Sequence, residues 1–170
     1  MPKLSLVIAP DPIFRKKAET IEQVDDEIRE MISQMFEILY REKGAGIGAN
    51  MVGLLKRIIV MDLKEGGKAS PLAMINPEIL ARSEEMQVFE EASLSYPGIS
   101  AEVIRSKEVT VAYLDEEGEP RKLTASGFLA TVIQHEMDYL EGKTYLDHLS
   151  RVKRDNLLRR YKKNKRQRVG

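Results

Sequence analysis

The chain has 170 residues, of which 42% are hydrophobic and 32% are charged with both signs mixed, so it can build one domain with a real core. No apolar run approaches the ~18 residues that a membrane span needs, and the first ten residues lack a signal peptide's long apolar core and cleavage site. We therefore expect a protein of the bacterial cytoplasm or of an organelle. Cysteine is absent, which excludes disulfides and thiolate metal ligands.

In the first half of the chain, the hydrophobic spacing predicts one helix and two strands. From Asp25, which suits an N-cap, the stretch "DDEIREMISQMFEILYRE" places its apolar residues on one face of an amphipathic helix. Residues 44–53, "GAGIGANMVG", are rich in glycine and are expected to form a tight loop. The stretch "LKRIIVMDL" predicts a strand, and "LAMINPEIL" predicts a strand broken at Pro77.

The second half of the chain predicts a hairpin followed by two helices. In "EVTVAYLDEEGEPRKLTA", two alternating segments flank a turn. Residues 128–140 predict a helix that Gly142 closes; apolar residues, Phe128 among them, lie nearly all round it, so it should be buried. A third helix from Val152 has a thin apolar stripe. Strands and helices do not alternate as βαβ units, so we expect a single α+β domain over residues 1–170.

Residues 151–170 form a basic tail on an acidic body. The tail holds ten Lys or Arg and one Asp, a net charge of +9, so residues 1–150 carry −9. This asymmetry is typical of a protein whose terminus meets an anionic partner, although a solvated helix that frays at its end has the same composition. We expect phosphate contacts rather than base stacking, and we expect residues 159–170 to be removable without unfolding the body. The basic residues are Arg151, Lys153, Arg154, Arg159, Arg160, Lys162, Lys163, Lys165, Arg166 and Arg168.

The stretch "QHEMDYLEG", residues 134–142, matches the beginning of a zinc-binding signature. In H-E-x-x-H, two histidines one helical turn apart bind the metal beside a catalytic glutamate. Here His135 and Glu136 are present, and Tyr139 occupies the second histidine position. A two-residue match is weak, because a single histidine in a buried helix is more often a hydrogen-bonded core residue. The stretch alone leaves both interpretations open.

Two upstream stretches make the pattern specific. "GAGIGANMVG" (44–53), "EEASLSYPG" (90–98) and "QHEMDYLEG" occur in this order and resemble the three signature motifs of peptide deformylases, G-x-G-L-A-A-x-Q, E-G-C-L-S and Q-H-E-x-D-H-L-x-G. The resemblance covers nearly the whole chain. It implies an α+β fold in which antiparallel sheets pack around a central buried helix that carries the H-E-x-x-H-like motif, with a C-terminal helix outside.

Each motif departs from the family pattern at a working residue. By resemblance, the three metal ligands of the family fall on Ser93, His135 and Tyr139, so that only His135 is retained. The glutamine whose amide stabilises the oxyanion falls on Met51. Glu136 keeps the position of the general acid and base. The resemblance also implies backbone contacts to substrate at Gly46 and Leu94.

The replacements disfavour the Fe²⁺ or Zn²⁺ that the family uses. A serine hydroxyl is far less acidic than a thiol with a pKa of ~8.5, and a tyrosine hydroxyl titrates near ~10. We therefore expect no metal cofactor. Without a metal no water is activated to a pKa near ~7, and Glu136 has no nucleophile to deprotonate. The absence of an amide donor at Met51 should separately slow hydrolysis by a factor of roughly 10²–10³.

Three functional hypotheses follow. The first is a deformylase-like protein that has lost catalysis and can keep a groove for nascent peptides. The second is an active deformylase, which removes the formyl group from N-formylmethionine using Ser, His and Tyr or a nearby acid as ligands; we expect neither His148 nor Asp138 to serve. The third is an interaction protein whose basic tail meets ribosomal RNA, and it is compatible with the first. No membrane partner is expected. Whether Tyr139 fills the groove or bonds Glu136 stays open.

Overall fold

The computed structural model describes residues 2–169, and the side chains of residues 2–167. The predicted domain ends Met1 and Gly170, and the side chain of Arg168, lie outside the described residues. Within residues 2–169, no helix is long and apolar enough to cross a membrane.

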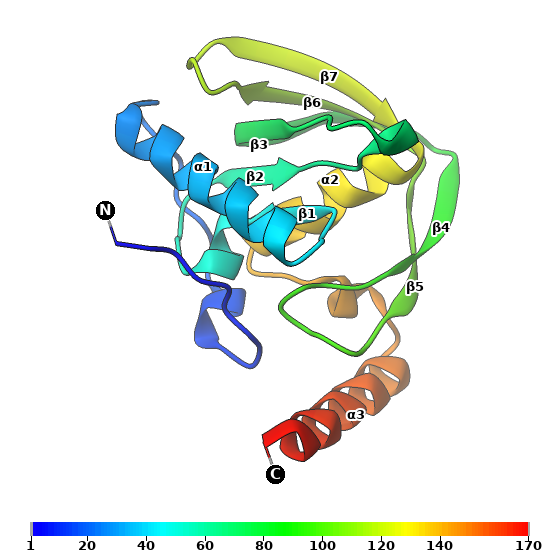
Figure 1. Ribbon diagram of the computed structural model, residues 1–170. Helices are drawn as coiled ribbons and strands as arrows, with labels where there is room; N and C mark the ends of the chain where they lie inside the picture. Colours follow the sequence, from blue (N-terminus) through cyan, green and yellow to red (C-terminus); the bar gives the residue numbers. More distant parts are fainter. Residues whose placement is uncertain (1, 170) are drawn as a thin grey trace.

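The fold is α+β, as predicted. A five-stranded antiparallel sheet has the order β1-β2-β3-β6-β7, and a separate antiparallel pair joins β4 to β5. Figure 1 shows α1 on one face of the β1–β2 region and α2 on the other, with α3 apart from both. The strands are β1 (Gly46–Gly48), β2 (Ile58–Met61), β3 (Leu72–Arg82), β4 (Met86–Glu91), β5 (Ala101–Ser106), β6 (Glu108–Leu114) and β7 (Pro120–Ser126), and the helices are α1 (Asp26–Arg41), α2 (Gly127–Leu140) and α3 (Arg151–Val169).

The central helix α2 is covered by the sheets. It contacts β1, β2 and β7, and every residue of β1 and β2 is buried because helices cover both faces there. The helix agrees with the prediction for residues 128–140, except at one position. Phe128 is 42% exposed, since it lies in the first turn at the surface, where its ring contacts Phe89 of β4 at 5.3 Å between centroids.

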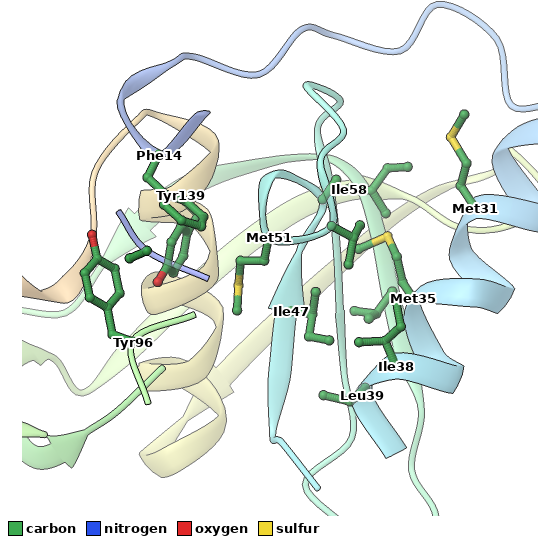
Figure 2. Packing of buried hydrophobic residues seen from close by; sticks show 14 of the residues in the cluster. Phe14, Met31, Met35, Ile38, Leu39, Ile47, Met51, Ile58, Tyr96 and Tyr139 are labelled. Carbon is green, nitrogen blue, oxygen red and sulfur yellow. The ribbon is translucent and has the colours of Figure 1, made fainter. Parts of the chain in front are cut away.

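The helix α1 forms where its spacing predicted. Asp25 is its N-cap, and the Asp25 side chain accepts a hydrogen bond from the backbone N–H of Ile28. The apolar face is buried in the main core. Figure 2 shows Met35, Ile38 and Leu39 of this helix directed toward Ile47 and Ile58 of the sheet.

Three local predictions need correction or detail. Residues 44–53 are more regular than a loop: they form β1 and a 3₁₀ turn, Ala49–Val52, which ends at Gly53 with φ 85°. The strand at Pro77 continues through the proline, with a register shift between Ile75 and Glu78. The strands β4 and β5 were not predicted. The predicted hairpin is confirmed as β6 and β7.

The basic tail is helical and packs against the body. Tyr161 is 3% exposed, its hydroxyl donates to the carbonyl oxygen of Ala9, and its ring lies 5.5 Å from that of Tyr96. The Lys165 ammonium donates to the same carbonyl at 3.0 Å. The expectation that residues 159–170 can be removed without unfolding the body stays a prediction. The structure adds that this removal would take away Tyr161, a core residue that anchors the helix.

Candidate functional site

A cavity of about 280 Å³ lies where the three motif stretches meet. One wall is β1 and the residues before it, the second is the end of β4 and the loop that follows, and the third is α2. The fold thus brings together the predicted residues Gly46, Met51, Ser93, Leu94, His135 and Glu136, which all line the cavity. Tyr139 is fully buried behind it and is not part of its lining.

Close approach between β1 and α2 explains why glycine occupies position 46. A Cβ on Gly46 would lie 2.9 Å from Val132 Cγ1 and 3.0 Å from Glu136 Cγ. Any larger residue would push the strand off the helix. Gly46 therefore lets a backbone edge pass directly over the Glu136 carboxylate, and this edge is the rim of the cavity.

The two altered ligand positions are bonded to each other. Ser93 Oγ and the Tyr139 hydroxyl are 2.6 Å apart in a buried hydrogen bond, and Ser93 Oγ also accepts from the backbone N–H of Ser95 at 3.2 Å. Burial raises the pKa of Tyr139 well above its ordinary value, so the hydroxyl stays protonated. The Tyr139 ring packs edge-on to Phe14, at 5.5 Å between centroids (Figure 2). Tyr139 thus neither opens into the cavity nor bonds Glu136.

His135 is held by a chain of charged side chains. Its Nδ1 lies 2.8 Å from Glu91 Oε1, and Glu91 also accepts two hydrogen bonds from the Arg105 guanidinium at 2.7 and 2.9 Å. Arg105 reaches on to Asp138 at 2.9 Å, and Asp138 meets His148 Nε2 at 2.8 Å. Both sequence histidines are therefore structural partners of carboxylates, and Asp138 does face away from His135, as expected.

Sequence reasoning missed Arg105. Its side chain is 3% exposed, although arginine is almost never fully buried unless it is paired. The signal that could have revealed it is its place in β5, two residues after the buried Val103, on the side of the strand that faces the core. Burial raises the pKa of Glu91, but hydrogen bonds from His135 and Arg105 outweigh it and hold that pKa below its usual range.

Glu136 is the unusual group of the site. It is 4% exposed, and its Oε2 is 3.9 Å from His135 Nε2, beyond hydrogen-bond distance. Its Oε1 makes no hydrogen bond of good geometry with the described residues, and the backbone N–H of Gly48 lies close enough to lower the pKa of Glu136. Burial raises the pKa of Glu136 to about 7. The nearby Gly48 N–H donates to Met51 Sδ at 3.4 Å. Met51 has no donor to offer a reacting oxygen, because its side chain ends in a thioether.

The donor set does not fit Fe²⁺ or Zn²⁺. Two of the three expected ligands are neutral hydroxyls that satisfy each other, and His135 offers only Nε2 because Nδ1 is engaged. Within the part of the chain that the structure describes, no group of three His, Asp or Glu side chains is arranged to hold a metal ion. By resemblance, the cavity keeps His135 and Glu136 together with the backbone-contact positions Gly46 and Leu94.

Comparisons with known proteins agree with the fold and the motifs. A family model described as polypeptide deformylase matches residues 3–155. A "Peptide deformylase-like" protein of Rickettsia conorii is 54% identical over 163 residues, covering 96% of this chain and 89% of the relative, and a peptide deformylase of Bartonella tribocorum is 42% identical over 166 residues, covering 96% and 93%.

Solved structures give the same result. The crystal structure of a peptide deformylase from Ehrlichia chaffeensis superposes with a TM-score of 0.91 at 35% identity, covering 99% of this chain and 100% of that one. The same enzyme in complex with actinonin has a TM-score of 0.91 at 37% identity, covering 98% and 99%. On these matches, the chain belongs to the peptide deformylase family.

Proposed function

We propose that this protein is a catalytically inactive member of the peptide deformylase family that keeps the cavity as a binding site for the amino-terminal end of newly made chains. One observation carries the proposal: the Ser93–Tyr139 hydrogen bond at 2.6 Å, which pairs two former ligand positions with each other. A bound metal would supply an activated water. Neither hydroxyl is acidic enough to hold that metal, since burial keeps Tyr139 protonated.

The remaining side chains support binding better than hydrolysis. Glu136 can hold or accept a proton, but no described group beside it activates water, and Met51 cannot donate to an oxyanion. The cavity itself is open and largely apolar, with Leu94 and Val132 on its walls, and its volume suits one side chain of methionine size. The Ehrlichia chaffeensis relative binds actinonin, so a protein of this architecture can hold a ligand.

A rescue experiment tests the proposal. Wild-type protein supplied with Fe²⁺, Ni²⁺ or Zn²⁺ should not hydrolyse formyl-Met-Ala-Ser above background. Ser93→Cys with Tyr139→His should bind metal, and adding Met51→Gln should restore measurable hydrolysis, because the backbone positions of the site are kept. Hydrolysis by the wild type that is lost in both His135→Ala and Glu136→Gln would instead support the alternative, an active deformylase with unusual ligands.

We also propose that the basic helix α3 contacts ribosomal RNA. Among the side chains that the structure describes, seven cations of this helix are exposed, while Tyr161 anchors the helix to the body. Contacts between these cations and phosphates release counterions, so binding should be tolerant of sequence and should weaken steeply with salt. The exposed cations are Arg151, Lys153, Arg159, Arg160, Lys162, Lys163 and Arg166.

Charge reversal tests this partner without removing the anchor Tyr161. Changing Arg159, Arg160, Lys162 and Lys163 to Glu should abolish co-sedimentation with ribosomes at moderate salt. The matched control reverses four exposed lysines outside the helix: Lys3, Lys16, Lys68 and Lys122. Equal loss in both variants, or no loss in either, would show that α3 is only a solvated helix.

A further inference from the structure

A groove of about 630 Å³ lies on a different face of α2 from the cavity described above, and the two share no lining residue. His135 and Glu136 line the cavity. Gln134, Met137 and Glu141, which lie three and four positions apart and so share one face of the helix, line the groove. The other walls of the groove are β3 and the paired strands β4 and β5. The groove is therefore separate from the candidate site.

Apolar side chains from four elements surround this groove. Met86 of β4 and Ile104 of β5 are 52% and 63% exposed, and Ile79 of β3 and Met137 of α2 are partly buried beside them. Single exposed apolar residues are ordinary at a protein surface. Several of them around one hollow instead provide a place where an apolar ligand can leave water.

Most of the charged side chains in the groove are already paired. Arg57 bonds Glu141, and Arg105 and His148 both bond Asp138. Two unpaired cations and one unpaired acid give the groove a net positive charge, which favours an anionic ligand. Within the part of the chain that the structure describes, the groove residues that form no ion pair are Arg82, Lys143 and Glu78.

Arg82 is the cation that the fold positions. Its Nη1 donates to Gln134 Oε1 at 3.1 Å. Gln134 is 4% exposed, and its amide nitrogen donates to the carbonyl oxygens of Ser106 and Ala130 at 2.9 and 3.0 Å, so its amide oxygen is fixed toward Arg82. A guanidinium has five N–H donors in one plane, and the bond to Gln134 uses one of them. The remaining donors suit a carboxylate, whose two oxygens arginine binds side by side.

We infer that the groove binds an apolar monocarboxylate of medium chain length, such as octanoate. The carboxylate lies on Arg82, and the alkyl chain lies along Met86 and Ile104. A peptide segment suits the groove less well, because each of its residues brings an N–H and a C=O that need partners, whereas an alkyl carboxylate has one polar end. This site is independent of the cavity and of the proposed function.

Nuclear magnetic resonance of protein labelled with carbon-13 in its methionine methyl groups tests the location. Of the eight methionines, Met86 and Met137 line the groove and Met51 lines the cavity. Octanoate should shift the methyl signals of Met86 and Met137 saturably and leave the signal of Met51 unchanged. Replacing each of the three by leucine in turn assigns the signals.

Three further probes define the ligand. Octylammonium has the same chain and the opposite charge, so it should bind about fivefold or more weakly than octanoate, because Arg82 and Lys143 repel it. Butanoate should bind about tenfold or more weakly, because it has four fewer methylenes to remove from water. The tripeptide acetyl-Ala-Ala-Leu, which ends in an apolar residue and a free carboxylate, should also bind more weakly than octanoate.

Matched variants assign the charge and the apolar wall. Arg82→Met keeps an apolar stem, so octanoate should bind about fivefold more weakly and lose its preference over octylammonium, whereas Arg41→Met, at an exposed arginine outside the groove, should change the affinity less than about 1.5-fold. Ile104→Ser should weaken binding, whereas Val152→Ser, at a similarly exposed residue of α3, should not. Glu78→Gln should strengthen binding, because it removes an acid from the groove. Circular dichroism checks that each variant is folded.

The methyl signals separate this inference from the proposed function, because Met51 reports on the cavity alone. Shifts at Met51 in place of Met86 and Met137, or no saturable shift at either of these two, would overturn the inference and leave peptide binding in the cavity standing. Equal binding of octanoate and octylammonium, or an unchanged affinity in Arg82→Met, would also overturn it. Tighter binding of the tripeptide than of octanoate would assign the groove to peptide ends instead.

Discussion

Replacing Tyr139 by phenylalanine tests how much the Ser93–Tyr139 bond stabilises the fold. The change removes only the hydroxyl and keeps the ring packed on Phe14. Ser93 Oγ then loses a buried partner at 2.6 Å but still accepts from the Ser95 N–H. Leaving a buried polar group without a partner costs roughly 1–3 kcal/mol, so we expect a loss of unfolding free energy in that range.

Ser93→Ala should cost at least as much as Tyr139→Phe. It leaves both the Tyr139 hydroxyl and the Ser95 N–H without an acceptor. The double variant should cost no more than Ser93→Ala alone, because it removes the Tyr139 hydroxyl that Ser93→Ala leaves without a partner, while the Ser95 N–H lacks its acceptor in both variants. The resulting coupling energy should be roughly 1–2 kcal/mol.

Urea unfolding followed by circular dichroism measures the cycle, since the chain has no tryptophan to report by fluorescence. The denaturant slope must be unchanged among the four proteins for the comparison to hold. If the two single losses simply add in the double variant, the hydrogen bond between Ser93 and Tyr139 does not stabilise the fold.

Three further predictions concern the surrounding charges and the pH response. Arg105→Leu should destabilise the fold by roughly 3–5 kcal/mol, because Glu91 and Asp138 lose their buried cation. Arg121→Leu, which breaks an ion pair at the surface, should leave the unfolding midpoint nearly unchanged in the same urea assay. The Tyr40 hydroxyl donates to Asp62 and raises its own pKa to about 12, so the stability difference between wild type and Tyr40→Phe should hold below pH ~10 and shrink as the pH rises toward 12. Burial raises the pKa of Asp62, but the hydrogen bonds to its carboxylate outweigh burial and lower that pKa below its usual value. The stability difference between wild type and Tyr40→Phe should therefore hold above pH ~4 and shrink as the pH falls below it. A stability difference that does not change with pH in either range would contradict this prediction. Tyr161→Ala should lower the melting temperature, whereas Lys162→Ala, next to it and exposed, should not; equal melting temperatures would show that α3 is not anchored.

The motif order and hydrophobic periods predicted most of the fold. Residues 128–140 read as a buried helix because apolar residues surround it, and the turn "DEEGE" located the hairpin of β6 and β7. The strand β4 escaped prediction because its pattern is inverted. Its apolar residues Met86 and Val88 are about half exposed, at 52% and 53%, while the charged Glu91 is buried. The usual rule, that the apolar side of an alternating strand faces the core, therefore assigns the solvent-exposed side of β4 to the core.

The site could be located from the sequence, but its bonding could not. The motifs placed Ser93 and Tyr139 near each other, and the structure adds that they bond to each other and not to Glu136. Which hydrogen-bond partner the Tyr139 hydroxyl takes depends on side-chain rotamers in a packed core, which the sequence does not specify. Arg105 was missed because its partners lie 14 and 33 positions away along the chain, which no local pattern reveals.

Elemental analysis of the protein, purified without chelator and under exclusion of oxygen, tests the central claim most directly. We predict far less than one Fe, Ni or Zn ion per chain, because Ser93 and Tyr139 are protonated and occupied with each other. The Ser93→Cys and Tyr139→His variant, purified in parallel, should retain metal. About one metal ion per wild-type chain, lost when His135 is changed to Ala, would contradict the account.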